Sequence, residues 1–371
     1  MLYVSSIIGF ILTLTLSFLL TGTVRKYALR KKILDIPNAR SSHSVATPRG
    51  GGLAIAVLFL LGVGIFAVSG IVSTNVATAL CGGGLLVALI GWIDDCRKLS
   101  VSVRAVFHFA AAIWAVYWLG GLSNLYVGFT TISIGLIDSI LAVVGIVWFI
   151  NLYNFMDGID GIAGSEALSV GLIGGTLTLA AGQPGLATAA WLLAAASAGF
   201  LLWNWPPAKI FMGDVGSGLL GYSFAVIAVG SEKLGGIPLL IWLLLLGVFI
   251  VDATATLLRR IWHGERWYEP HRTHVYQLAV QAGFSHKQVT LTVLGLNILL
   301  AALALISIFW PGTLLWVFFA GNLLLLGLHV FLLRFFGCRQ TLTTVEGKRQ
   351  ISYMDNNISF LILFEQVDKH E

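Results

Sequence analysis

Long uninterrupted apolar runs constrain this chain more than any other feature. Only 11% of its 371 residues are charged, and 57% are hydrophobic. Soluble domains carry about 25% charged residues, whereas a helix that crosses a bilayer needs about 20 mostly apolar residues. The pattern predicts an all-α, polytopic integral membrane protein with about eleven transmembrane helices. The expected spans are residues 3–23, 50–70, 75–93, 104–120, 131–150, 162–182, 186–204, 217–232, 237–258, 289–309 and 313–334.

The remaining composition narrows the function class. The net charge of +5 would suit nucleic acid, but the chain has no compact basic domain, so we expect no nucleic-acid partner. The three cysteines share no metal-ligand spacing, which argues against a zinc site or a disulfide framework. We predict one transmembrane catalytic domain over residues 1–334 and a cytoplasmic tail over residues 335–371.

The basic residues predict the orientation of the spans. With eleven spans, 21 of the 22 Lys and Arg residues fall on one face, and only Lys233 falls on the other. Because cytoplasmic loops of membrane proteins are enriched in Lys and Arg, we predict a periplasmic N-terminus and a cytoplasmic C-terminus. The polar residues with chemical potential lie on the predicted cytoplasmic loops as well, so we expect the chemistry at that surface.

Two adjacent acids, Asp94 and Asp95, end the third predicted span. A helix C-terminus disfavours negative charge, so this pair needs a compensating cation. The neighbours Arg97 and Lys98 could supply it as solvated charges. A metal–phosphate site is the sharper alternative, because Mg²⁺ takes oxygen ligands and the phosphates of a substrate.

A second polar run follows the fifth predicted span. Asn151, Asn154, Asp157 and Asp160 recur every three residues in a loop without Lys or Arg. On a continuous helix this spacing would turn the first and last side chains in opposite directions. We expect glycines in the run to break the helix and gather these side chains around one pocket. Helix capping by Asp160 would explain one of the acids but not all four polar residues.

Further polar groups lie on three other predicted cytoplasmic segments. Asp214 opens the eighth predicted span next to glycines. Either Asp214 caps this helix, or the free N–H groups at the helix N-terminus bind a phosphate. The basic residues of the other two segments have two explanations. They are either exposed charges that follow the positive-inside rule, or ligands of a diphosphate or a lipid phosphate. Those basic residues are His43, Arg49, His271, Arg272 and His274.

Taken together, these loops predict Mg²⁺-assisted phosphoryl transfer with one phosphate partner anchored in lipid. A transporter or flippase of a lipid-linked precursor is the alternative, but it should carry its polar residues near mid-membrane on repeated halves. A structural scaffold would explain the spans and leave the Asn/Asp run without a role.

In order and sidedness, the motifs resemble those of the polyprenyl-phosphate N-acetylhexosamine-1-phosphate transferases, glycosyltransferase family 4. This family includes the phospho-MurNAc-pentapeptide translocase and the enzymes that start O-antigen synthesis. The resemblance extends from about residue 40 to residue 290, and the run from Asn151 to Gly161 is its most specific part. Because a pentapeptide-type histidine run is lacking, the O-antigen-initiating branch is favoured. The family's His-x-His-His motif is replaced here by His271-Arg272-Thr273-His274.

The resemblance implies transfer of a sugar 1-phosphate from a UDP-N-acetylhexosamine to undecaprenyl phosphate, with release of UMP, at the cytoplasmic face of a bacterial inner membrane. The cofactor would be Mg²⁺, or Mn²⁺ in its place, and a homodimer is compatible with the family. Asp214 would bind the metal with help from Asn154, beside Asp94 and Asp95. The other implied contacts are Asn151, Asp157, Asp160 and Phe211 for the nucleotide, and His271, Arg272, His274, Arg49 and His43 for the diphosphate, sugar or lipid phosphate.

Overall fold

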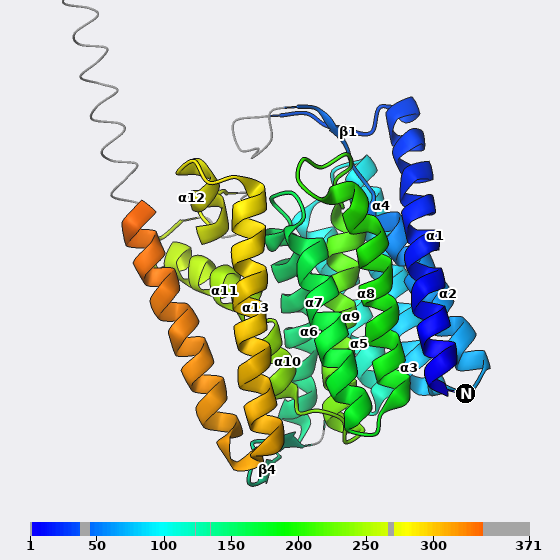
Figure 1. Ribbon diagram of the computed structural model, residues 1–371, viewed down its shortest axis with the longest axis vertical. Helices are drawn as coiled ribbons and strands as arrows, with labels where there is room; N and C mark the ends of the chain where they lie inside the picture. The colour runs from blue at the N-terminus through cyan, green and yellow to red at the C-terminus, as the bar shows by residue number, and fades with distance from the viewer. Residues whose placement is uncertain (1, 38–44, 123, 134, 266–270, 337–371) are drawn as a thin grey trace, which may run out of the picture.

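Long helices make up most of the chain in the computed structural model, which describes residues 2–37, 45–122, 124–133, 135–265 and 271–336 (Figure 1). The α-helices are α1 (Leu2–Lys31), α2 (Gly52–Val68), α3 (Thr74–Thr78), α4 (Gly84–Cys96), α5 (Val101–Leu119), α6 (Leu136–Met156), α7 (Ile162–Ala180), α8 (Pro184–Asn204), α9 (Asp214–Lys233), α10 (Leu239–Leu245), α11 (Gly247–Trp262), α12 (Val275–Gln281) and α13 (His286–Phe309). A last, unlabelled helix follows in the stretch Pro311–Phe336.

Two short antiparallel hairpins and two irregular turns complete the described elements. In one hairpin β1 (Leu34–Asp35) pairs with β2 (Thr47–Pro48), and in the other β3 (Leu125–Tyr126) pairs with β4 (Thr131–Ile132). A π-helical turn, Ala79–Gly83, joins α3 to α4, and a 3₁₀ turn, Pro311–Thr313, starts the last helical stretch.

The helical membrane fold is confirmed. Among the described residues, nine helical stretches are long and apolar enough to cross a membrane. The pair α10 and α11 would add a tenth, although the two helices are bent by 79° at their junction. The short apolar helix α2 occupies the predicted span 50–70. Every predicted span thus has a helical counterpart, and the orientation of these helices across the membrane stays a prediction.

The predicted boundaries of the fifth span, residues 131–150, were wrong at both ends. The chain first forms the β3–β4 hairpin, so α6 begins only at Leu136. At its other end α6 continues through the polar run as far as Met156, because a polar side chain at a helix end can bond to the helix itself. Asn151 does so, donating from Nδ2 to the carbonyl of Val147 at 2.7 Å.

Helix α9 forms the centre of the bundle, and every side chain from Val215 to Ser231 is buried. Close approach of α2 to the start of α9 depends on two glycines. A Cβ atom added at Gly52 would lie 2.3 Å from the Cα atom of Gly216, a distance that backbone atoms cannot accommodate. The two helices therefore meet backbone to backbone at the end of the bundle where α9 begins.

The predicted cytoplasmic segments gather at one end of the bundle. Figure 1 shows the β1 hairpin, the C-terminal end of α1 and the short helix α12 at this end, whereas the N-terminus and β4 lie at the other. Helix α11 crosses the neighbouring helices obliquely. Apart from residues 335 and 336, the predicted tail lies outside the described residues.

Candidate active site

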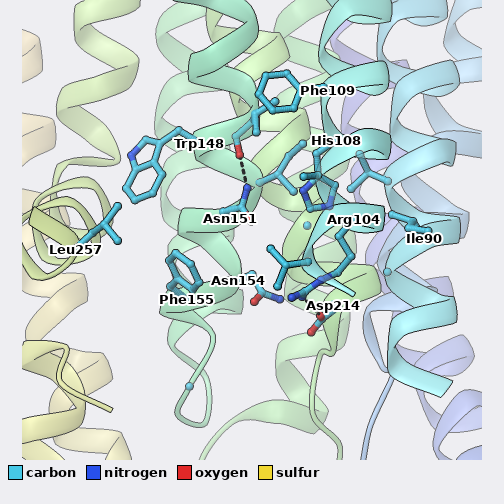
Figure 2. A pocket seen from close by; sticks show the side chains of 18 of the residues that line it. Ile90, Arg104, His108, Phe109, Trp148, Asn151, Asn154, Phe155, Asp214 and Leu257 are labelled. Carbon is cyan, nitrogen blue, oxygen red and sulfur yellow. Dashed lines mark hydrogen bonds and ion pairs between the residues drawn. The ribbon is translucent and has the colours of Figure 1, made fainter. Parts of the chain in front are cut away.

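A cavity of about 560 Å³ opens among the ends of α4, α5, α6, α9 and α11 (Figure 2). One part of its wall is apolar and includes Val144, Trp148 and Leu257. The other part is polar, and its residues come from helices that are far apart in sequence. The polar lining residues are Arg104, His108, Asn151, Asn154, Asp214, His271, His274, Tyr276 and Gln277.

Asp214 is the first residue of α9 and holds two cations at the cavity. Gly213 before it has a φ of +78°, a left-handed conformation that favours glycine, so the chain can turn sharply into the helix. The Asp214 carboxylate accepts a hydrogen bond from Arg49, and its Oδ2 lies 3.4 Å from the NH1 atom of Arg104. Figure 2 shows Asp214 and Arg104 next to each other below His108.

Asp95 caps α9 from the side, and it is not among the cavity-lining residues. Its side chain is fully buried. Oδ1 accepts from the backbone N–H of Asp214 at 2.9 Å and Oδ2 from that of Val215 at 3.1 Å. Arg49 Nε adds a third partner, 2.8 Å from Oδ1. The charge that seemed unfavourable at the end of α4 is thus compensated by the N-terminus of α9 and by Arg49.

Asp94 points to a different set of partners. Its Oδ1 accepts from the backbone N–H of Leu99 at 2.6 Å, which fixes the turn after α4. Its Oδ2 lies 3.4 Å from Arg104 NH1, so this arginine bridges Asp94 and Asp214. The sequence neighbours considered as counterions, Arg97 and Lys98, give way to arginines from α5 and from the segment before α2.

The two asparagines of the polar run lie on the last turns of α6 and line the cavity. Asn154 Nδ2 donates to Ser217 Oγ at 3.1 Å, and Ser217 Oγ donates to the carbonyl of Gly213 at 3.2 Å. These bonds tie α6 to the first turn of α9. In Figure 2 the amide nitrogen of Asn154 is on the side of Asp214, and the amide oxygen points away from Asp214.

The two acids of the polar run lie outside the cavity lining. Asp157 ends α6, and burial raises its pKa well above the ordinary value; Arg49 opposes this, and the charges of Asp214 and Asp95 add to it. Asp160 holds a neighbouring loop and α13, because its Oδ2 accepts from the N–H of Ala208 at 3.0 Å and lies 3.3 Å from His286 Nδ1. The chain does break after α6, but the four side chains do not share one pocket.

Phe211 and Arg49 belong to a backbone junction between two loops. The N–H of Phe211 donates to the carbonyl of Pro48 at 2.8 Å, and the carbonyl of Phe211 accepts from Gly51 at 2.9 Å. Phe211 is not among the cavity-lining residues. Burial lowers the pKa of Arg49, but the charges of Asp214 and Asp95 outweigh this and raise it above the ordinary value, so Arg49 stays charged.

The imidazoles of His271 and His274 form one wall of the cavity, with ring centres 4.8 Å apart. Phe155 stacks on His274 with a centre distance of 6.2 Å. Burial, with the charges of His274, Arg260 and Arg259, lowers the pKa of His271 to about 3, so this ring is neutral near pH 7. Arg272 is exposed and does not line the cavity, and His43 lies outside the described residues.

Asp252 of α11 positions this wall. It is buried and caps α12, accepting from the N–H groups of Val275 at 3.0 Å and Tyr276 at 3.3 Å. Its Oδ1 also lies 3.5 Å from Nδ1 of His274 and 3.7 Å from Nδ1 of His329 on the last helix. Because Nδ1 of His274 faces Asp252, the opposite ring edge with Nε2 is the one left for the cavity.

Arg104 and His108 are cavity residues that the sequence reasoning did not select. Both stand on α5, four residues apart and hence on one helix face. Arg104 Nε and His108 Nδ1 are buried without a hydrogen-bond partner among the described residues. Arg104 was counted only as a topological charge. Its position at the start of an otherwise apolar helix was the available signal, because a cation there needs a partner.

Comparison with known proteins gives a consistent family. Residues 77–232 match the family described as glycosyl transferase family 4. A relative in Bacillus subtilis, named probable undecaprenyl-phosphate N-acetylglucosaminyl 1-phosphate transferase, is 30% identical over 292 residues, which cover 77% of this chain and 80% of the relative.

Two further relatives come from other bacteria. The decaprenyl-phosphate N-acetylglucosaminephosphotransferase of Mycolicibacterium smegmatis is 32% identical over 334 residues, covering 80% of this chain and 81% of the relative. The undecaprenyl-phosphate alpha-N-acetylglucosaminyl 1-phosphate transferase of Escherichia coli O157:H7 is 30% identical over 300 residues, covering 76% and 78%.

Proposed function

Because the chain belongs to glycosyl transferase family 4, the family of polyprenyl-phosphate N-acetylhexosamine-1-phosphate transferases, we propose that it transfers a HexNAc 1-phosphate from a UDP-N-acetylhexosamine to undecaprenyl phosphate. The proposed site is the cytoplasmic face of a bacterial inner membrane, and the lipid diphosphate sugar formed there would initiate O-antigen or another cell-surface polysaccharide. The observation that supports this most is one cavity joining Asp214 and Arg104 to an apolar wall.

In the reaction, an oxygen of the lipid phosphate attacks the β-phosphorus of the UDP-sugar. The bond from that phosphorus to the bridging oxygen of the α-phosphate breaks, and UMP leaves with this oxygen. The C1–O bond of the sugar stays intact, so the anomeric configuration is retained. A phosphate monoester has a second pKa near 6, so the attacking group is already largely deprotonated at neutral pH and needs little help from a base.

Arg104 is suited to hold the attacking phosphate. Its Nε is buried and has no hydrogen-bond partner in the described part of the chain, and its NH1 is held between Asp94 and Asp214 at 3.4 Å from each. A guanidinium offers several donors in fixed geometry to a phosphate. In this proposal Asp94 positions Arg104 and does not remove a proton. The apolar wall, which includes Val147 and Trp148, would receive the first part of the polyprenyl chain.

The donor set fits a magnesium ion. Within the described residues no three His, Cys, Asp or Glu side chains come together as a metal cage, but Mg²⁺ is typically bound by one or two carboxylates together with substrate phosphates and water. Asp214 would hold it, assisted by the amide oxygen of Asn154 after rotation of that amide group, and Mn²⁺ has the same ligand preference. When bound, the ion would neutralise charge on the diphosphate.

The wall of histidines would contact the diphosphate and sugar. His271 is neutral near pH 7 and can both donate and accept a hydrogen bond. His274 presents Nε2 to the cavity because Asp252 faces its Nδ1. Asn151, Asp157, Asp160 and Phe211 stay proposed for the nucleotide, although of these only Asn151 lines the cavity.

The test is a donor panel of UDP-GlcNAc, UDP-GalNAc and a 6-deoxy UDP-HexNAc with purified protein, undecaprenyl phosphate and Mg²⁺. We expect UMP release and a lipid diphosphate sugar with one donor, and loss of most turnover in Asp214→Asn. Asp138→Asn serves as the matched control, since Asp138 is a buried acid in the first turn of α6, far from the cavity end. Release of UDP instead of UMP, or no release from any donor, would overturn the proposal.

A further inference from the structure

Two cations lie against one aromatic ring at the end of the bundle where the predicted cytoplasmic segments gather, away from the cavity. The guanidinium carbon of Arg25 lies 5.8 Å from the ring centre of Trp203, and the ammonium nitrogen of Lys209 lies 5.7 Å from it. An indole face attracts a cation, but two like charges brought to one ring repel each other. Within the described part of the chain, neither cation is paired with a carboxylate.

The arrangement is fixed by hydrogen bonds that leave the charges available. Arg25 Nε donates to the carbonyl of Lys209 at 3.0 Å, which holds the arginine of α1 against the loop after α8. The indole N–H of Trp203 donates to the carbonyl of Phe18 at 2.9 Å, and the two rings stack with centres 5.3 Å apart. The terminal guanidinium nitrogens and the Lys209 ammonium have no hydrogen bond within the described residues.

The position of this group along the helices is the one expected for a membrane boundary. Arg25 is the first charge after the long apolar stretch of α1, and Trp203 is the residue before the end of α8 at Asn204. Tryptophan gathers at the membrane–water interface, where its ring spans apolar and polar surroundings. Basic side chains at that depth attract anionic lipid headgroups. None of the three residues lines the cavity.

We propose that Arg25, Lys209 and Trp203 form a binding site for the phosphate headgroup of an anionic phospholipid. The lipid phosphate would lie between the two cations and relieve their repulsion, while its acyl chains follow the outer surface of α1 and α8. The source is a membrane lipid and not free phosphate, because the site stands where two apolar helices leave the bilayer.

The loop that carries Lys209 connects this site to the cavity. The backbone N–H of Lys209 donates to the carbonyl of Trp203 at 2.8 Å and fixes the position of Lys209 in this loop. The preceding residue, Ala208, donates to Asp160, and the same loop ends at Asp214. A bound headgroup would therefore steady the loop that brings Asp214 to the start of α9.

The experiment measures retention of phosphatidylglycerol and of phosphatidylcholine by native mass spectrometry of the detergent-solubilised full chain. We expect Arg25→Gln/Lys209→Gln to bind phosphatidylglycerol about 30-fold more weakly, the loss that two basic side chains near a lipid surface correspond to. The matched control is Lys26→Gln/Arg30→Gln, which removes two charges from the same basic segment of α1 but none of the Trp203 contacts. Arg25→Lys/Lys209→Arg keeps both charges and should retain the lipid.

The outcomes separate the alternatives without any assay of transferase activity. Equal retention of phosphatidylglycerol by the wild type and the Arg25→Gln/Lys209→Gln variant would overturn the proposal. Equal losses in that variant and in the control would assign retention to net charge and overturn it as well. If inorganic phosphate at millimolar concentration displaces phosphatidylglycerol, or phosphatidylcholine binds equally well, the site does not select an anionic lipid and the proposal fails.

Discussion

Replacing Asp95 by Asn tests whether this acid acts through α9 or in the chemistry itself. The change keeps the shape of the side chain but removes the charge that accepts two N–H groups of α9 and pairs with Arg49. Loss of a helix cap costs about 1 kcal/mol. Removing one partner of a buried ion pair costs about 3–5 kcal/mol. Because Arg49 keeps Asp214 as a second partner, we expect a total near the lower end, about 3 kcal/mol.

The measurement is the free energy of unfolding in mixed micelles, with turnover recorded on the same preparations. The comparison variant is Asp94→Asn, which loses one backbone N–H and a 3.4 Å contact with Arg104. We expect Asp94→Asn to cost about 1 kcal/mol of stability. Relative to that stability loss, its loss of turnover should be larger than that of Asp95→Asn, because Arg104 lines the cavity. Wild-type stability of Asp95→Asn together with a thousandfold loss of turnover would refute the capping argument.

Three further predictions follow from separate contacts. Asp252→Asn should raise KM for the UDP-sugar about tenfold with a smaller change in kcat. Because Asp252 acts through the ring of His274, adding His274→Asn should change KM little further. Additive effects in this double-mutant cycle would contradict that positioning role. Gly52→Ala should destabilise the fold by about 3 kcal/mol or more, since the new Cβ meets the backbone of Gly216, whereas Gly64→Ala on the same helix meets no atom within 4 Å and should be neutral in the same unfolding assay. The pKa of His271 is near 6.5 in the unfolded chain and about 3 in the folded protein. The free energy of unfolding should therefore fall as the pH drops from 6.5 towards 3, and His271→Gln should flatten that part of the stability–pH curve. An unchanged slope in the variant would be inconsistent with the buried ring.

Sequence patterns predicted the helices well because apolar length is a property of each segment alone. The limits of α6 were harder to place, since Asn151 and Asn154 look like loop residues. Their side chains are satisfied by Val147 and Ser217, and the helix continues past them. The bend between α10 and α11 was likewise invisible in a run of apolar letters.

The sequence predicted which residues belong to the candidate site better than it predicted how they are arranged. Asp214 and Asn154 line one cavity, and so do His271 and His274, which lie far along the chain. The sequence could not separate Asp94 from its neighbour Asp95, because adjacent letters say nothing about which side chain points to α9. Nor could it indicate that Asp160 faces Ala208 and His286, since those contacts depend on how three distant segments pack.

The charged cluster around Asp214 also bears on how such a chain can be made. Arg49, Asp95 and Asp214 become partners only when α9 has joined the bundle, long after the first two have left the ribosome. All three stand at helix tips or in the adjoining loop. Each side chain can therefore stay solvated at the bilayer surface while its partners are still being synthesised. No unpaired charge has to enter the hydrocarbon region, where it would be costly. Placing the cluster at the edge of the membrane lets insertion proceed helix by helix, with pairing as its last step.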